Sequence, residues 1–264
     1  MNAAETRAVR IVRATQLGRS TGAGDRDAHR ADFETPTYGL QEATGGRARA
    51  VAGNLPLKGF PRLAEAAAEA MKTMETGWHY HNVDVQLAFI TGGEIDIAYS
   101  DGEWRRCRGG EILLIPGYVP HNAGRISPSY GLVELTFPGE FGSIPCPPHP
   151  RSGPVDGSVL TDDQVQATAI DGVATYVLPP ALTRTTDLRL ITSGAGIVET
   201  PRGGLTLTLL FSGRCEVDAA GEHSLLGPFD MLIDDDEGDR ATLSNRSPDF
   251  RAYQVQRWKR SGPT

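Results

Sequence analysis

The strand pattern in the first half of this chain returns in the second half. Residues 86–97 (QLAFITGGEIDI) align with residues 206–217 (TLTLLFSGRCEV) at an offset of 120, and residues 111–114 (EILL) align with residues 230–233 (DMLI) at an offset of 119. Two segments that agree within one residue of shift indicate an internal repeat of one structural unit. The 264 residues are enough to bury a core in each of two units.

The first copy is rich in short strand patterns. Four runs combine apolar and β-branched residues: Leu87–Ile90, Glu94–Tyr99, Glu111–Ile115 and Gly131–Phe137. Glycine- and proline-containing turns separate them, and the Asp-Gly pair at residues 101–102 is a strong hairpin signal. The 31 glycines and 18 prolines are spread along the chain, which suits many short strands better than a helical bundle. The sequence therefore predicts an all-β protein.

Proline marks the boundary between the two copies. Residues 142–154 (GSIPCPPHPRSGP) contain too much proline for the interior of a strand and are typical of a linker. We therefore expect an N-terminal arm over residues 1–50, a first unit over 51–140, the linker over 141–156 and a second unit over 157–264. Within the arm, Arg7–Gln16 has the pattern of a strand.

Charge and hydropathy narrow the classes of partner. The net charge is −7 and the lysines and arginines form no cluster, whereas a nucleic-acid surface needs a basic footprint. No apolar run reaches the roughly 7–15 residues of a signal peptide or the ~20 of a membrane span. We therefore expect a cytoplasmic protein that binds neither nucleic acid nor membrane. Cys107, Cys146 and Cys215 share no C-x-x-C spacing, so we expect free thiols in a reducing compartment.

Four side chains are spaced to meet at one metal ion. His79 and His81 are two residues apart, and in a strand such residues project from the same face. A short turn brings Gln86 in at the start of the next strand, and the Pro-Gly turn at residues 116–117 lets His121 return to the same point. Three imidazoles and one oxygen donor suit a borderline divalent ion: Fe, Mn, Co, Ni, Cu or Zn.

The spacing of these residues resembles the two motifs of the cupin superfamily. Residues 77–93 (GWHYHNVDVQLAFITGG) are similar to the first cupin motif, and residues 110–122 (GEILLIPGYVPHN) are similar to the second. The resemblance extends in pattern over residues 50–137. It implies two tandem cupin barrels, each a double-stranded β-helix or jelly roll. It also implies that His79, His81, Gln86 and His121 are the metal ligands of the first barrel.

Gln86 departs from the family pattern, which usually has glutamate at this place. An amide accepts no proton at neutral pH and binds metal more weakly, which counts against quercetinase-type and oxalate-degrading chemistry. It also leaves the ion with its full +2 charge, which favours capture of an anionic substrate. In this respect the site is similar to the three-histidine cupin dioxygenases and to the bicupin isomerase of the bacilysin pathway. The alternative is that Gln86 donates a hydrogen bond beside the metal without binding it.

The second copy lacks these ligands. At the offsets of the repeat, the four ligand positions correspond to Glu199, Pro201, Thr206 and Arg240. Proline and arginine do not bind divalent metals, so we expect no metal in the second barrel.

Glu134 is a candidate acid, base or substrate contact. It lies in the run Gly131–Phe137, which resembles the last strand of a cupin barrel, where its side chain would point into the cavity. The alternative is a charge on the outer face of an alternating strand.

These residues together predict a mononuclear metal-dependent enzyme. The leading hypothesis is an Fe(II) dioxygenase acting on a small anionic organic substrate, with secondary metabolism as the setting that the bacilysin-pathway likeness implies. One alternative is a non-redox isomerase, cyclase or lyase that uses the ion as a Lewis acid. A second is a non-catalytic cupin that binds a small molecule. Because such barrels leave edge strands that need covering, we also expect a homodimer.

Overall fold

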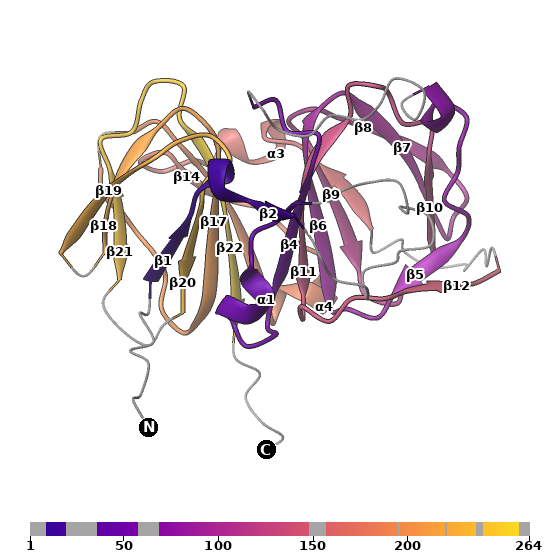
Figure 1. Ribbon diagram of the computed structural model, residues 1–264, viewed down its shortest axis with the longest axis horizontal. Helices are drawn as coiled ribbons and strands as arrows, with labels where there is room; N and C mark the ends of the chain where they lie inside the picture. The colour runs from indigo at the N-terminus through magenta and orange to yellow at the C-terminus, as the bar shows by residue number, and fades with distance from the viewer. Residues whose placement is uncertain are drawn as a thin grey trace, which may run out of the picture. The chain divides into compact units, whose positions relative to one another are not determined.

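Strands predominate in the computed structural model (Figure 1). It describes residues 9–19, 36–57, 69–147, 157–194, 196–219, 221–235 and 240–258. These form two compact units: the first barrel, within residues 17–162, and the second barrel, within residues 1–16 and 163–264. The helices with described bounds are single turns: η1 Ala14–Gln16, α1 Leu40–Ala43, α3 Asp163–Gln166 and α4 Pro180–Thr183. The all-β prediction is therefore confirmed, and no helix in the described ranges is long and apolar enough to span a membrane.

The first barrel consists of two antiparallel sheets with the strand orders β13-β9-β6-β11-β4-β3-β2 and β12-β5-β10-β7-β8. The larger sheet contains β2 Gly18–Arg19, β3 Pro36–Thr37, β4 Arg49–Gly53, β6 Val85–Gly92, β9 Ile112–Pro116, β11 Gly131–Phe137 and β13 Ser158–Leu160. The smaller contains β5 His79–His81, β7 Glu94–Tyr99, β8 Trp104–Arg108, β10 His121–Gly124 and β12 Ser143–Pro145. The four predicted runs lie in β6, β7, β9 and β11, with only Glu111 outside its strand.

The core of the first barrel lies between its two sheets. Alternating residues of the larger sheet, such as Ile90 and Ile115, meet alternating residues of β7, such as Ile95 and Ile97. Each of these side chains is buried, and burying an aliphatic side chain of this size contributes roughly 1.5–3 kcal/mol to stability. The period-2 pattern of the sequence thus fixes which residues face inward, and Gln86, two residues before Ala88 and four before Ile90, shares their face.

The second barrel repeats the topology of the first. Its sheets have the strand orders β1-β20-β17-β22-β15-β14 and β16-β21-β18-β19. Their bounds are β1 Val9–Val12, β14 Val173–Thr175, β15 Thr186–Thr192, β16 Val198–Glu199, β17 Gly204–Ser212, β18 Cys215–Ala219, β19 Glu222–Leu226, β20 Met231–Asp234, β21 Ala241–Ser244 and β22 Arg251–Trp258. Strand β17 pairs with β20 and β22 as β6 pairs with β9 and β11, and β18 pairs with β19 and β21 as β7 pairs with β8 and β10. The internal repeat is therefore a repeat of strand pairing.

The boundaries of the two units differ from the predicted ones. Strand β1, predicted within an N-terminal arm, pairs with β20 of the second barrel. Strand β3 and helix α1, also from the predicted arm, belong to the first barrel, as does β4, which begins in that arm. Strand β12 from the predicted linker pairs with β5, and β13 from the predicted second unit pairs with β9. Pairing between segments far apart in the chain leaves no local signal in composition. Residues 148–156 of the linker lie outside the described residues.

Candidate metal centre

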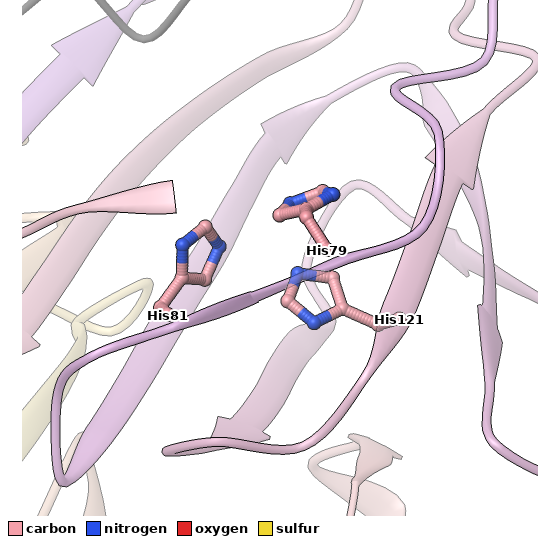
Figure 2. A group of neighbouring side chains, drawn as sticks. All are labelled: His79, His81 and His121. Atoms are coloured by element: carbon pink, nitrogen blue, oxygen red, sulfur yellow. The ribbon is translucent and has the colours of Figure 1, made fainter. Parts of the chain in front are cut away.

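Three histidines from two neighbouring strands meet inside the first barrel. His79 and His81 project from β5, and His121 begins β10, where it pairs with His79. Figure 2 shows the three rings turned toward one another, with ring centroids 4.4–4.9 Å apart. One nitrogen from each ring can be chosen so that all three lie within 4.8 Å of one another. This spacing allows all three to bind one ion, and it is the only such group of His, Cys, Asp or Glu within the described ranges.

Each imidazole is oriented through its Nδ1 atom. Nδ1 of His79 lies 2.8 Å from the carbonyl oxygen of Gly77, and Nδ1 of His121 lies 2.9 Å from that of Val119. Nδ1 of His81 lies 3.1 Å from the hydroxyl oxygen of Ser143. A carbonyl oxygen only accepts hydrogen bonds, so Nδ1 of His79 and of His121 carries the proton and donates. Nε2 is then the nitrogen that has a lone pair for a metal, an arrangement typical of metal-binding histidines.

A tight turn places His121 beside the other two histidines. The amide of Gly117 donates to the carbonyl of Asp84, and the amide of Tyr118 donates to that of His81. These bonds hold the turn after β9 against the turn that follows β5. A side chain at Gly117 would meet the carbonyl oxygen of Val83 at 1.6 Å, so this approach requires glycine. The Pro-Gly pair in the sequence therefore has a direct role in assembling the site.

His121 is a neutral imidazole in this setting. Burial, and then the nearby His79 and His81, lower the pKa of His121 well below its usual value. Only neutral imidazole ligates a metal, so His121 is already in its ligating form at neutral pH.

Gln86 and Glu134 lie beside the histidines and are bonded to each other. Both side chains are buried, Gln86 at 4% and Glu134 at 1% exposure, and both line the same pocket as the histidines. The amide Nε2 of Gln86 donates to Oε2 of Glu134 over 2.9 Å. Oε1 of Gln86 has no hydrogen-bond partner in the described part of the chain. Glu134 therefore points inward, and it fixes which end of the Gln86 amide faces away from it.

Sequence reasoning missed three residues that support this pair and the histidines. Arg49 of β4 forms an ion pair with Glu134, with 3.4 Å between Nη1 and Oε1. The guanidinium of Arg49 also lies over the ring of Phe141, which stacks on His81 with centroids 4.5 Å apart. Ser143, in the predicted linker, contacts His81 directly. No motif marks these residues, because only the pairing of β4 with β11 and of β12 with β5 brings them to the site.

The pocket in front of the histidines is mostly apolar. Its lining consists of Thr76, His79, His81, Gln86, Ala88, Ile95, Ile97, Leu113, Ile115, His121, Ala123, Tyr130, Leu132 and Glu134. This set contains no lysine or arginine, and its one carboxylate is bonded to Gln86 and to Arg49. An anionic ligand in the pocket would therefore need a metal ion as its positive partner.

Comparisons with known proteins agree with this architecture. No family model and no curated protein matches the sequence. Among solved structures, salicylate 1,2-dioxygenase from Pseudoaminobacter salicylatoxidans in complex with gentisate is 17% identical, with a TM-score of 0.62 over 96% of this chain and 82% of that one. Oxalate decarboxylase from Bacillus subtilis, which contains Mn(II) centres, is 11% identical, with a TM-score of 0.54 over 83% and 71% of the two chains. Both are cupin proteins. The chain has the cupin fold.

The pairing register corrects the correspondence between the two cupin barrels. His121 pairs with Tyr99, and the residue 120 positions later, Ala241, pairs with Ala219. Ala241, rather than the predicted Arg240, therefore stands in the place of His121. Arg240 instead forms an ion pair with the exposed Glu199.

The counterpart of His79 also shifts by one residue. Thr200 exchanges hydrogen bonds with Ala241, since its amide donates to the Ala241 carbonyl and its hydroxyl accepts from the Ala241 amide. Thr200, rather than Glu199, therefore stands in the place of His79. The predicted counterpart of Gln86 is right: Gln86 pairs with Thr136, and Thr206 pairs with Gln256. None of these counterparts is a histidine.

The residues of the first cupin barrel fit a divalent metal ion. Each of the three imidazoles offers one ring nitrogen, which is Nε2 for His79 and His121. The buried Oε1 of Gln86 needs a partner, because an unsatisfied buried carbonyl oxygen costs about 1–3 kcal/mol. Nitrogen donors with one neutral oxygen are the set that first-row transition metals prefer.

Proposed function

We propose that the first cupin barrel holds one Fe(II) ion on His79, His81, His121 and Gln86, and that the protein is a dioxygenase for a small anionic organic substrate. The observation that supports this most is the neutral donor set: three imidazoles and an amide oxygen in a pocket whose lining has no lysine or arginine. Iron is proposed among the suitable metals because oxygen chemistry needs a redox-active ion.

The neutral donor set determines how substrate binds. No ligand in the set carries a negative charge, so the positive charge of a bound ion is not reduced by the protein. In a water-poor pocket that charge attracts an anionic group far more strongly than it would in bulk water. When bound, the ion supplies Lewis acidity and, as iron, electron transfer with oxygen. A substrate with a carboxylate beside a hydroxyl group suits such a site.

The chain's own residues orient the substrate and exclude water. Aliphatic side chains from both sheets, including Ile97, Leu113 and Leu132, form the walls of the pocket. They offer an apolar surface to the body of the substrate, so that its anionic group is the part that binds the positive ion. Thr76 and Tyr130, at the same pocket, are the polar side chains available for its remaining hydrogen bonds.

We propose a positioning role for Glu134 instead of the acid–base role that the sequence suggested. Its Oε2 accepts from the Gln86 amide and its Oε1 pairs with Arg49, so two partners hold the carboxylate in place. A carboxylate held in this way is less free to approach a substrate proton, which favours the dioxygenase over the isomerase, cyclase or lyase alternative.

Metal analysis and oxygen uptake test the proposal. Protein purified without oxygen is expected to contain one iron per chain and to consume oxygen with an aromatic hydroxy acid. Gentisate and salicylate are the first to try, because a solved structure with this fold is a salicylate dioxygenase in complex with gentisate. Turnover of a substrate without oxygen uptake would overturn the dioxygenase in favour of an isomerase or lyase. Tight binding without turnover would favour a sensor.

We also propose that the protein forms a homodimer. Strand β14 is at the edge of the larger sheet of the second barrel, and exposed apolar side chains flank it, with Ile170 75% and Val177 91% exposed. Such an edge is typically covered by a partner. Sedimentation at micromolar concentration is expected to give a dimer that Val177→Asp weakens. A wild-type monomer would contradict the proposal.

A further inference from the structure

The two smallest of the described side chains that line the pocket of the first barrel lie next to the metal centre. They are Ala88 and Ala123. Ala88 follows the proposed ligand Gln86 by two residues on β6, and Ala123 follows His121 by two residues on β10. Each alanine therefore faces the same way as its neighbour at the metal centre, about 6.6 Å farther along the strand.

Both alanines lie toward the same end of the pocket. Strand β6 runs into the turn that starts β7, so Ala88 lies nearer to that turn than the proposed ligand on β6 does. Strand β10 is antiparallel to β7, and His121 pairs with Tyr99 at the end of β7. Ala123 pairs with Ile97, which is nearer to the start of β7. The two sheets therefore present their small residues on the same side of the metal centre.

The space between Ala88 and Ala123 suits a flat group, and we name it the alanine slot. Two packed sheets lie about 10 Å apart, and each Cβ atom stands about 1.5 Å off its backbone, which leaves about 7 Å between facing alanine methyl carbons. A flat ring whose carbons meet both methyl groups at a contact distance of about 3.5–4.0 Å needs a gap of about 7–8 Å. A puckered ring is thicker and needs a wider gap.

The backbone on each side of the alanine slot is held by hydrogen bonds. Strand β6 is paired on both sides, with Ala88 opposite Leu113 of β9 and Glu134 of β11. The amide of Ala123 donates to the hydroxyl of Thr76 over 3.0 Å, and its carbonyl accepts from the amide of Thr76 over 2.8 Å. The width of the slot is therefore set by paired strands.

Larger residues take both places in the second barrel. By the strand correspondence between the two barrels, the counterpart of Ala88 is Thr208 and that of Ala123 is Leu243. Leu243 is fully buried and belongs to the hydrophobic core of that barrel. The barrel with the three histidines thus keeps space where the other barrel fills its core.

We propose that Ala88 and Ala123 determine substrate specificity: they admit an acid with a flat, conjugated body and reject a puckered body with the same carbon skeleton. This inference rests on the proposed function, because the metal ion must hold the anionic group for the body to lie in the alanine slot. Leu113 and Ile97, which pair with the two alanines, line the same pocket and offer apolar contacts to the edges of the ring.

Benzoate and cyclohexanecarboxylate are the probes that test it, because they share a carboxylate and seven carbon atoms and differ in the shape of the ring. Each is titrated calorimetrically into the full-length protein loaded with Zn²⁺, which supports no oxygen chemistry. Benzoate is expected to bind about tenfold or more tightly than cyclohexanecarboxylate, since pockets discriminate by this much over small differences in shape. Azide, which needs only the metal ion, is titrated in parallel to report on the centre itself.

Two changes at one position give a matched comparison. Ala123→Leu introduces the residue of the second barrel and is expected to weaken benzoate binding at least about tenfold while azide still binds. Ala123→Gly widens the slot and is expected to raise the affinity for cyclohexanecarboxylate relative to benzoate. Ala88→Val repeats the first change on the other sheet, should Ala123→Leu fail to fold.

The outcomes separate this inference from the proposed function. Equal binding of benzoate and cyclohexanecarboxylate overturns the alanine slot, and so does benzoate binding that neither Ala123→Leu nor Ala88→Val weakens. Binding of azide without binding of benzoate overturns it as well. Each of these results leaves the metal centre standing. Failure of both azide and benzoate to bind the zinc-loaded protein overturns the metal centre and the slot together.

Discussion

We expect His121→Ala to abolish both metal retention and turnover. His121 is 2% exposed, and its side chain is one of the three imidazoles that converge in the first barrel. Loss of a residue that hydrogen-bonds to a metal ligand lowers metal affinity by roughly 10–100-fold. Loss of a ligand itself should lower metal affinity by more than this. Metal content after dialysis and the dissociation constant of the reloaded metal measure the effect.

His223→Ala is the matched control for this change. His223 is exposed on β19 of the second barrel, in a sheet that contributes no residue to the site, and its loss is expected to leave metal content unchanged. Because His121 is buried, the melting temperature of the metal-free variant should be recorded as well, to separate loss of the ligand from loss of the fold. A folded His121→Ala protein that still retains one tightly bound ion would refute the three-histidine centre.

The convergence of the histidines could be predicted because its signals are local. The i, i+2 spacing of His79 and His81 places both on one face of a strand, and the Pro-Gly turn before His121 marks a sharp change of direction. The strands themselves follow from period-2 patterns with turn residues between them. Each of these features depends on residues close together in the chain, and the structure has them where the sequence predicted.

The supports of the site could not be predicted because they depend on pairing between distant segments. Arg49 reaches Glu134 only through the pairing of β4 with β11, and the segment of Arg49 was assigned to an arm. The one-residue shifts that put Thr200 and Ala241 in the places of two histidines are visible only in the strand register. A sequence offset fixes a correspondence to within one residue, and on a strand one residue exchanges the inner for the outer face.

We expect Gln86→Glu to tighten metal binding while it destabilises the metal-free protein. The new carboxylate would face Glu134 at the hydrogen-bond distance that Gln86 Nε2 now occupies, so two buried carboxylates would repel each other. An uncompensated buried charge costs roughly 3–5 kcal/mol, which a bound divalent ion would offset. The melting temperature should therefore fall without metal and rise by more than in the wild type when metal is added. Turnover of an anionic substrate should fall, since the carboxylate lowers the net charge of the centre.

The exchanged pair, Gln86→Glu with Glu134→Gln, separates ligation from packing. Here the amide at position 134 donates to the carboxylate at position 86, so the hydrogen bond is restored in reverse and the metal-free protein should regain most of the lost stability. If residue 86 binds the metal, the exchanged pair should still hold the ion more tightly than the wild type does, because the carboxylate stays beside it. If Gln86 is only a hydrogen-bond donor near the histidines, the exchanged pair should have the metal affinity of the wild type, and the centre would be reduced to three histidines. Glu134→Gln alone completes the double-mutant cycle over positions 86 and 134. It keeps the amide at position 86 but removes the carboxylate that orients this amide, so metal affinity should fall by about tenfold.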